Sequence, residues 1–110
     1  MQFILLVYES EEWPRQPETE RKRVKDACVA WHQDLVKRGH GRVMQGLDAG
    51  ATVRLKNELP IVTDGPFAET KEVLGGYEIV ECNDTGEAIA IAKAFPALKI
   101  GFAMEVRHMR

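Results

Sequence analysis

The chain has 110 residues, of which 45% are hydrophobic and 29% are charged, and its formal net charge is -2. This length suits one domain over residues 1–110, and the composition excludes a mainly disordered chain. The weak negative charge, without an exposed basic stripe, argues against a nucleic-acid-binding protein.

The N-terminal stretch 2–8 predicts a strand in the middle of a sheet, because apolar side chains alternate onto both of its faces. One face carries Phe3, Leu5 and Val7, and the other carries Ile4, Leu6 and Tyr8. The stretch is too short to span a bilayer and lacks the features of a signal peptide. Two cysteines without CxxC spacing, Cys28 and Cys82, then indicate reduced thiols, so we expect a cytoplasmic protein with no membrane partner.

A long amphipathic helix is predicted to start near Pro17 and to end before Gly39. Its apolar face repeats at spacings of four, three and four residues, and consists of Val24, Cys28, Trp31 and Leu35. His32 directly follows Trp31 in the sequence and lies beside this apolar face of the helix. We therefore expect His32 at the boundary between the core and solvent.

The middle of the chain predicts a short strand over 41–47, with Val43 and Leu47 facing inward, and then a hairpin. The hairpin pairs residues 52–56 with residues 59–63 across Asn57-Glu58. It leads into Asp64-Gly65-Pro66, a turn sequence in which glycine supplies a positive φ. The polar segment that follows, up to Gly75-Gly76, is either a binding loop on a rigid frame or a solvated connection.

The C-terminal third predicts a strand over 77–82, a second helix and a final strand over 102–107. Asp84 is expected to cap the helix, with Glu87 three residues on, and Pro96 to stop it. The order of elements matches an α+β, ferredoxin-like split βαβ fold with an inserted hairpin and both helices on one face of an antiparallel sheet. The other face of the sheet is also apolar, so we expect a homodimer that covers it.

The segment Asp64-Gly65-Pro66-Phe67, followed by Leu74-Gly75-Gly76-Tyr77 and an apolar strand, resembles the YCII-related family, in the branch named for its DGPF motif. The similarity extends over nearly the whole chain. It implies a dimeric α+β barrel built of ferredoxin-like halves. The family has no settled reaction, so the resemblance leaves the activity open.

The same resemblance implies a catalytic pair of a histidine on the first helix and an aspartate near the sheet. His32 and Asp64 are the corresponding candidates here, and such a pair suits general acid-base chemistry. The alternatives are a half-buried helix residue for His32 and an Asx-turn residue for Asp64. The resemblance also implies an association with sigma factors of the extracytoplasmic type.

Four further residues are candidate substrate-binding groups: Phe67, Glu69, Lys71 and Tyr77. On an extended segment Glu69 and Lys71 would face the same way, whereas on a helix Lys71 would be solvated. Tyr77 could present its hydroxyl group to a cavity or lie in the core. We find no zinc signature around His40 or His108 and no motif for a nucleotide or another cofactor.

Two functions follow from these patterns. The first is a small-molecule enzyme or ligand binder that uses His32 and Asp64. The second is a non-enzymatic dimeric module that binds a regulatory partner protein, such as a sigma factor. An exposed apolar patch outside the dimer interface would favour the second.

Overall fold

The computed structural model describes residues 1–65 and 72–110 of the chain. The elements, in order, are β1 (Gln2–Glu9), η1 (Trp13–Arg15), α1 (Glu18–Lys37), β2 (Gly41–Gly46), β3 (Ala51–Lys56), β4 (Leu59–Asp64), β5 (Val73–Glu81), α2 (Thr85–Lys93), η2 (Pro96–Ile100) and β6 (Ala103–His108).

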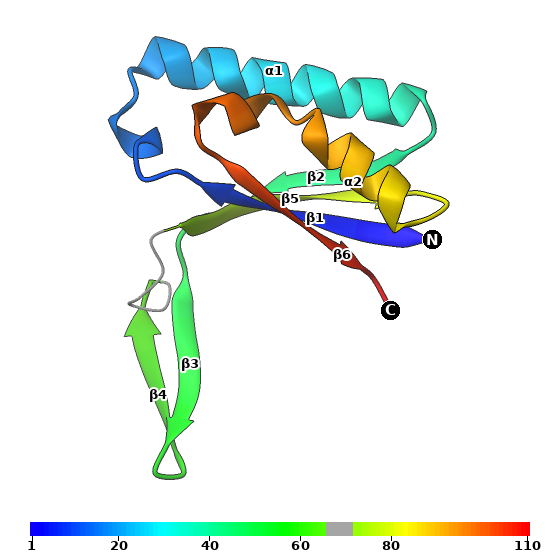
Figure 1. The fold of residues 1–110 in the computed structure, drawn as a ribbon. Helices are drawn as coiled ribbons and strands as arrows, with labels where there is room; N and C mark the ends of the chain where they lie inside the picture. The colour runs from blue at the N-terminus through cyan, green and yellow to red at the C-terminus, as the bar shows by residue number, and fades with distance from the viewer. Residues whose placement is uncertain (66–71) are drawn as a thin grey trace.

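The main sheet has four strands in the order β2-β5-β1-β6, and every neighbouring pair is antiparallel. Both helices cover one face of this sheet (Figure 1). β1 and β5 lie in the centre, and for β1 this is the position that its two apolar faces predicted. The α+β, ferredoxin-like arrangement is thus confirmed.

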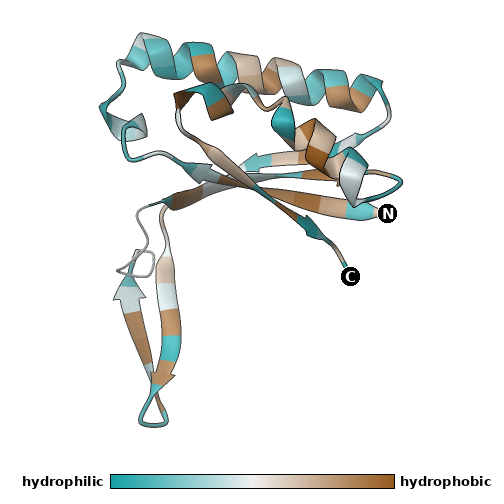
Figure 2. Ribbon diagram, viewed as in Figure 1, coloured by the Kyte–Doolittle hydropathy of each residue, from teal (hydrophilic) through white to brown (hydrophobic). Residues whose placement is uncertain are grey.

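The core fills the space between the helices and the sheet. Its buried members come from β1, α1, β5 and α2: Phe3, Leu5, Leu35, Val80, Cys82, Ala88 and Ile91. A second cluster joins Val24 of α1 to Phe95 and Ala97. The apolar stripe of α1 faces the sheet and its outer side is polar, which Figure 2 shows as alternating colours along the helix.

The predicted cap of α2 is also present. The Asp84 carboxylate accepts a hydrogen bond from the backbone N–H of Glu87 at 2.8 Å. The Glu87 carboxylate in turn accepts one from the backbone N–H of Asn83 at 3.0 Å. These bonds satisfy N–H groups that the first turn of a helix leaves free.

The predicted inward face of β2 is wrong. A β-bulge between Gly41 and Val43 adds one residue to β2, so Val43 lies opposite Ile79 and Met44 lies opposite Glu78. Val43 therefore points away from the helices and is 44% exposed, and Leu47, beyond the end of the strand, is exposed too. A single inserted residue reverses the alternation of side chains, and the sequence does not reveal it.

The face of the sheet opposite the helices, which we call the open face, is apolar at its centre. The strand register places Ile4 beside Ile79 and Leu6 beside Tyr77. All four side chains are only partly covered. Nothing within the described part of the chain lies across this face, in agreement with the predicted two-sided character of β1 (Figure 1).

β3 and β4 form a separate two-stranded hairpin. Asn57 and Glu58 both have positive φ, 52° and 67°, which is the geometry of a two-residue type I′ turn. The hairpin projects from the main sheet on the side away from the helices (Figure 1). It makes the molecule extended: the radius of gyration is 15.7 Å, whereas a compact chain of this length has about 13 Å.

Candidate functional site

A cavity of about 320 Å³ lies between α1 and the helix-facing side of the sheet. Its walls are mostly apolar and aromatic, and include Val7, Trp13, Val24, Cys28, Trp31, Phe95, Phe102 and Met104. The few polar side chains on its wall are Glu9, Lys25, Gln45 and Glu78. Apolar walls with a few polar groups are typical of small-molecule sites.

Glu78 is the most unusual residue of this cavity, because it is an acidic residue and yet only 1% exposed. Alternation along β5 turns its side chain toward the helices, like Gly76 and Val80 on either side. His32 of α1 meets it there: Nδ1 lies 2.6 Å and 2.9 Å from the two carboxylate oxygens. The His32 side chain is 19% exposed, as expected for a boundary residue.

The environment of Glu78 favours its neutral form. Burial raises the pKa of Glu78, and the hydrogen bond and charge of His32 partly oppose this effect. A carboxyl group with a raised pKa can exchange a proton nearer to neutral pH than an exposed one. The pair His32–Glu78 can therefore take up and release a proton beside the cavity.

A second carboxyl group, Glu9, lies at the end of β1 and also lines the cavity. Burial raises the pKa of Glu9, and the nearby positive charge of Lys25 opposes this. Leu5 pairs with Glu78, so Glu9 is four residues further along the sheet, or about 13 Å from Glu78 at the rise of a strand. The cavity thus has a polar group near each end.

Two glycines of β5 form part of the cavity wall. A Cβ atom on Gly76 would lie 2.8 Å from the carbonyl oxygen of Gln45, and one on Gly75 would overlap the carboxylate of Glu9. Gly76 is therefore needed for the close approach of β5 to β2, whereas at Gly75 the flexible Glu9 side chain would have to move.

The structure brings His32 together with Glu78 and places Asp64 elsewhere. Asp64 is the exposed last residue of β4, and no hydrogen bond or ion pair joins it to His32 within the described residues. Tyr77 borders the cavity, but it is the neighbour of Glu78 along β5, so by alternation its side chain belongs to the open face. The other candidate substrate-binding residues, Phe67, Glu69 and Lys71, lie outside the described residues.

Glu78 was missed by sequence reasoning. The signal was present, because an acidic residue interrupts the apolar run of the strand predicted over 77–82. A charged residue at such a position needs a buried partner. The sequence gives no means of choosing which face Glu78 takes, or which helix residue meets it.

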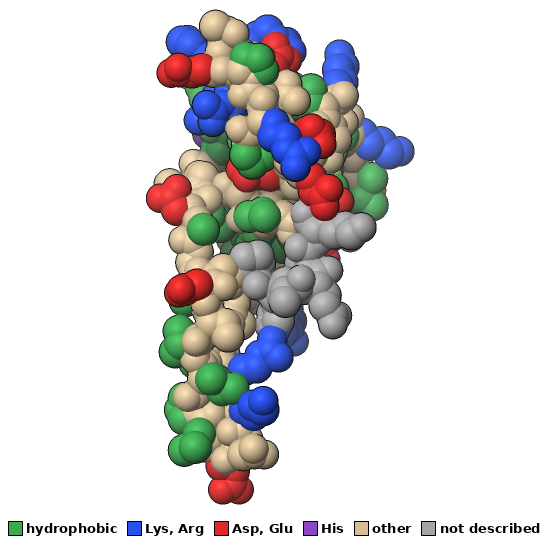
Figure 3. All heavy atoms as spheres, turned by 90° about the vertical axis from the view of Figure 1, so that its left-hand side faces the viewer, with side chains coloured by type: hydrophobic (Ala, Val, Ile, Leu, Met, Phe, Trp, Pro, Cys, Tyr) green, Lys and Arg blue, Asp and Glu red, His purple; other side chains and the backbone are tan. Residues whose placement is uncertain are grey.

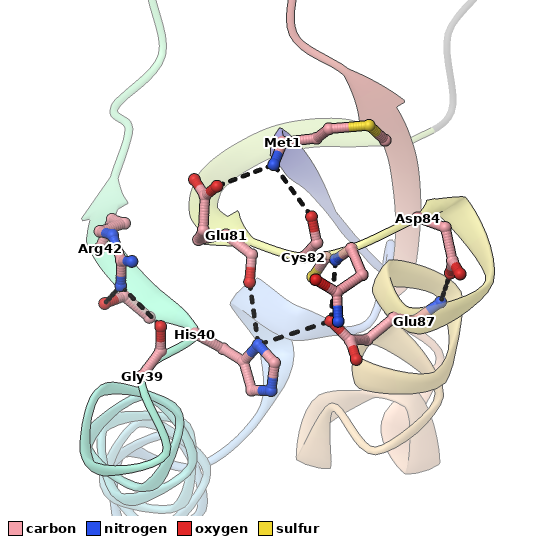
Figure 4. A network of polar contacts seen from close by, with 10 residues as sticks. Met1, Gly39, His40, Arg42, Glu81, Cys82, Asp84 and Glu87 are labelled. Atoms are coloured by element: carbon pink, nitrogen blue, oxygen red, sulfur yellow. Dashed lines mark hydrogen bonds and ion pairs between the residues drawn. The ribbon is translucent and has the colours of Figure 1, made fainter.

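Three possible metal ligands, His40, Cys82 and Glu87, gather at the opposite end of the molecule, with ligand atoms within 4.8 Å of one another. Figure 4 shows that these groups already have structural partners. His40 Nδ1 donates to the carbonyl oxygen of Glu81 at 2.8 Å, and Glu87 caps α2. Burial also raises the pKa of the Cys82 thiol, which opposes the thiolate form that metals bind.

Comparison with known proteins settles the relationship of this chain. A model of the YCII-related domain matches residues 1–110. The chain belongs to the YCII-related family. An uncharacterized protein of Rhizobium meliloti (strain 1021), R00369, is 31% identical over 97 residues, which cover 84% of this chain and 78% of the relative.

A solved structure with a similar fold is 5-chloro-2-hydroxyhydroquinone dehydrochlorinase (TftG) from Burkholderia phenoliruptrix AC1100, in complex with 2,5-dihydroxybenzoquinone. The TM-score is 0.56 at 18% sequence identity, and the match covers 100% of this YCII-related chain and 94% of TftG. At this identity the likeness establishes the fold. Within residues 1–65 and 72–110, no helix has the length and apolar character needed to cross a membrane.

Proposed function

We propose that this YCII-related protein is a small-molecule enzyme or ligand binder whose site is the cavity between α1 and the sheet. The observation that carries the proposal is Glu78, a carboxyl group that lines the cavity, is 1% exposed and is bonded to His32. A buried, paired acid beside an apolar cavity is costly for folding and is therefore a candidate for chemistry.

In this proposal Glu78 is the acid-base group, because its side chain belongs to the cavity wall. His32 is a positioning residue: it holds the Glu78 carboxyl group in place and adjusts its proton affinity. The predicted His–Asp pair is thus replaced by a His–Glu pair. The raised pKa lets Glu78 donate a proton to a bound molecule, or accept one, at a pH nearer to neutral than an exposed carboxyl group would.

The cavity suggests the class of ligand. Aromatic walls from Trp13, Trp31 and Phe102 favour a flat apolar body. Glu78 and Glu9 offer hydrogen bonds to hydroxyl or keto groups. A small phenolic or quinone-like molecule meets both requirements, and the molecule bound in the TftG structure, 2,5-dihydroxybenzoquinone, is of this class.

The test is calorimetric titration of the protein with 2,5-dihydroxybenzoquinone and a set of substituted phenols. We expect binding of at least one of them, and a loss of about tenfold or more in affinity for Glu78→Gln, which replaces the buried carboxyl group by an amide that cannot exchange a proton with the ligand. Glu12→Gln, an exposed carboxylate in η1's N-terminal turn, is the matched control. Equal affinities of the two variants would contradict the proposal.

In this proposal Asp64 is a ligand-binding residue and no longer the acid partner of His32, whereas the segment after it keeps its predicted ligand-binding role. Asp64 ends β4, and Phe67, Glu69 and Lys71 follow it in the connection to β5, a strand whose Gly75 borders the cavity. We propose that this connection contributes polar groups to the ligand. Asp64→Asn in the same titration separates this role from that of an Asx-turn residue.

We also propose that the protein forms a homodimer through the open face. Ile4, Leu6, Tyr77 and Ile79 make an apolar surface that water would otherwise cover. Sedimentation should give a particle of two subunits at micromolar concentration. The regulatory alternative, association with a sigma factor, has no support in the comparisons, and a cytoplasmic location stays a prediction from the cysteines.

A further inference from the structure

The hairpin of β3 and β4 has two chemically different sides. Antiparallel partners point to the same side, so the register puts Val53 with Val62 and Leu55 with Pro60 on one side. We call these four residues the apolar side of the hairpin. The other side alternates with it and is mixed, with Thr52, Arg54 and Lys56 from β3 opposite Thr63, Ile61 and Leu59 from β4. Figure 3 shows hydrophobic side chains along one edge of the hairpin and Lys and Arg on the other.

The apolar side is uncovered within the described chain. Val53, Leu55 and Val62 are 65%, 70% and 62% exposed. Neither strand has a buried residue. A two-stranded hairpin in water is marginally stable at best, and burial of one apolar side against another surface is the usual way to stabilise it. The sequence of the hairpin thus requires a partner surface.

The direction of the hairpin limits what that surface can be. It projects on the same side of the sheet as the open face (Figure 1). Its strands have six residues each, so they reach about 20 Å, whereas two packed sheets are about 10 Å apart. A molecule that packs on the open face is therefore within reach of the hairpin.

We propose that the apolar side of the hairpin is an arm that packs against the flank of a second copy of this chain. The inference rests on the proposed homodimer, and one partner then accounts for both uncovered apolar surfaces. Two-fold symmetry makes the contact reciprocal, because each subunit extends its hairpin past the sheet of the other.

The chain offers a matched pair of variants. Leu55 and Leu59 are 70% and 69% exposed, but Leu59 pairs with Lys56 on the opposite side of the hairpin. Sedimentation of Leu55→Ser should show a dimer dissociation constant raised by about tenfold or more, because each dimer buries this side chain twice. Leu59→Ser should stay within about twofold of the unchanged protein.

A second measurement does not depend on the stability of the hairpin. A benzophenone amino acid at position 55 should give a covalent dimer on irradiation, and one at position 59 should not. The arm proposal would be overturned if the two serine variants dimerised equally well and position 55 gave no crosslink. The cavity proposal would then remain intact. A monomeric unchanged protein would overturn both the dimer and the arm, whereas failure of the phenol titrations would affect only the proposed ligand.

Discussion

His32 Nδ1 contacts both carboxylate oxygens of Glu78, at 2.6 Å and 2.9 Å, across the boundary between α1 and β5. Both groups depend on this contact, because Glu78 is almost fully buried and His32 is largely covered. The pair therefore links the stability of the protein to the chemistry of the cavity.

Removal of His32 should destabilise the protein. His32→Ala leaves the Glu78 carboxyl group buried without its partner, and we expect the free energy of unfolding to fall by about 1–3 kcal/mol. Denaturant unfolding followed by circular dichroism measures this change. In a Glu78→Leu background the same histidine substitution should cost less, because no buried polar group is left; an equal cost in both backgrounds would contradict the coupling.

Glu78 should also make stability depend on pH. Burial raises its folded-state pKa above the ordinary value of 4.5, so the folded protein holds this proton more tightly than the unfolded chain. The stabilisation is full below pH 4.5 and is lost as the pH rises through the folded-state pKa. As the pH rises from acidic to neutral, the free energy of unfolding should therefore fall more for the wild-type protein than for Glu78→Gln. Parallel curves would show that Glu78 does not titrate in this range.

Gly76 should tolerate no side chain. In Gly76→Ala the new Cβ atom would lie 2.8 Å from the carbonyl oxygen of Gln45, and we expect a loss of about 1–3 kcal/mol in unfolding free energy. Its partner in the register, Gly46, is the control, because a Cβ atom there would lie 4.0 Å from its nearest neighbour. Gly46→Ala should change stability by less than about 0.5 kcal/mol. The idea fails if thermal unfolding ranks the two variants in the opposite order.

The cap of α2 predicts a smaller effect. Asp84→Ala removes the acceptor for the Glu87 N–H, which should lower the free energy of unfolding by about 1 kcal/mol. Asn83→Ala is suited as the comparison, because Asn83 contributes its backbone N–H to the cap. Urea unfolding should place Asn83→Ala close to the unchanged protein, and a larger loss for Asn83→Ala would be inconsistent with this cap.

The layout of the fold could be predicted from the sequence because the spacing of apolar residues and the positions of turn and cap residues indicate the same elements. Each of three patterns identifies one element: the alternation of apolar residues in β1, the spacing of three and four residues in α1, and the Asn57-Glu58 turn of the hairpin. The orientation of β2 could not be predicted, since the bulge before Val43 leaves no mark in composition. The His32 prediction identified a group that borders the core, while its buried partner, 46 positions away, is a matter of tertiary packing.

The cavity wall formed by Gly75 and Gly76 consists of main chain alone. A ligand there meets peptide groups, whose chemistry no substitution can change, and a bulkier residue at Gly76 collides with Gln45. Around this part of the wall, a change of ligand preference therefore has to come from the side chains that face it. The ligand preference of the cavity can be changed at three positions of α1: Val24, Cys28 and Val29.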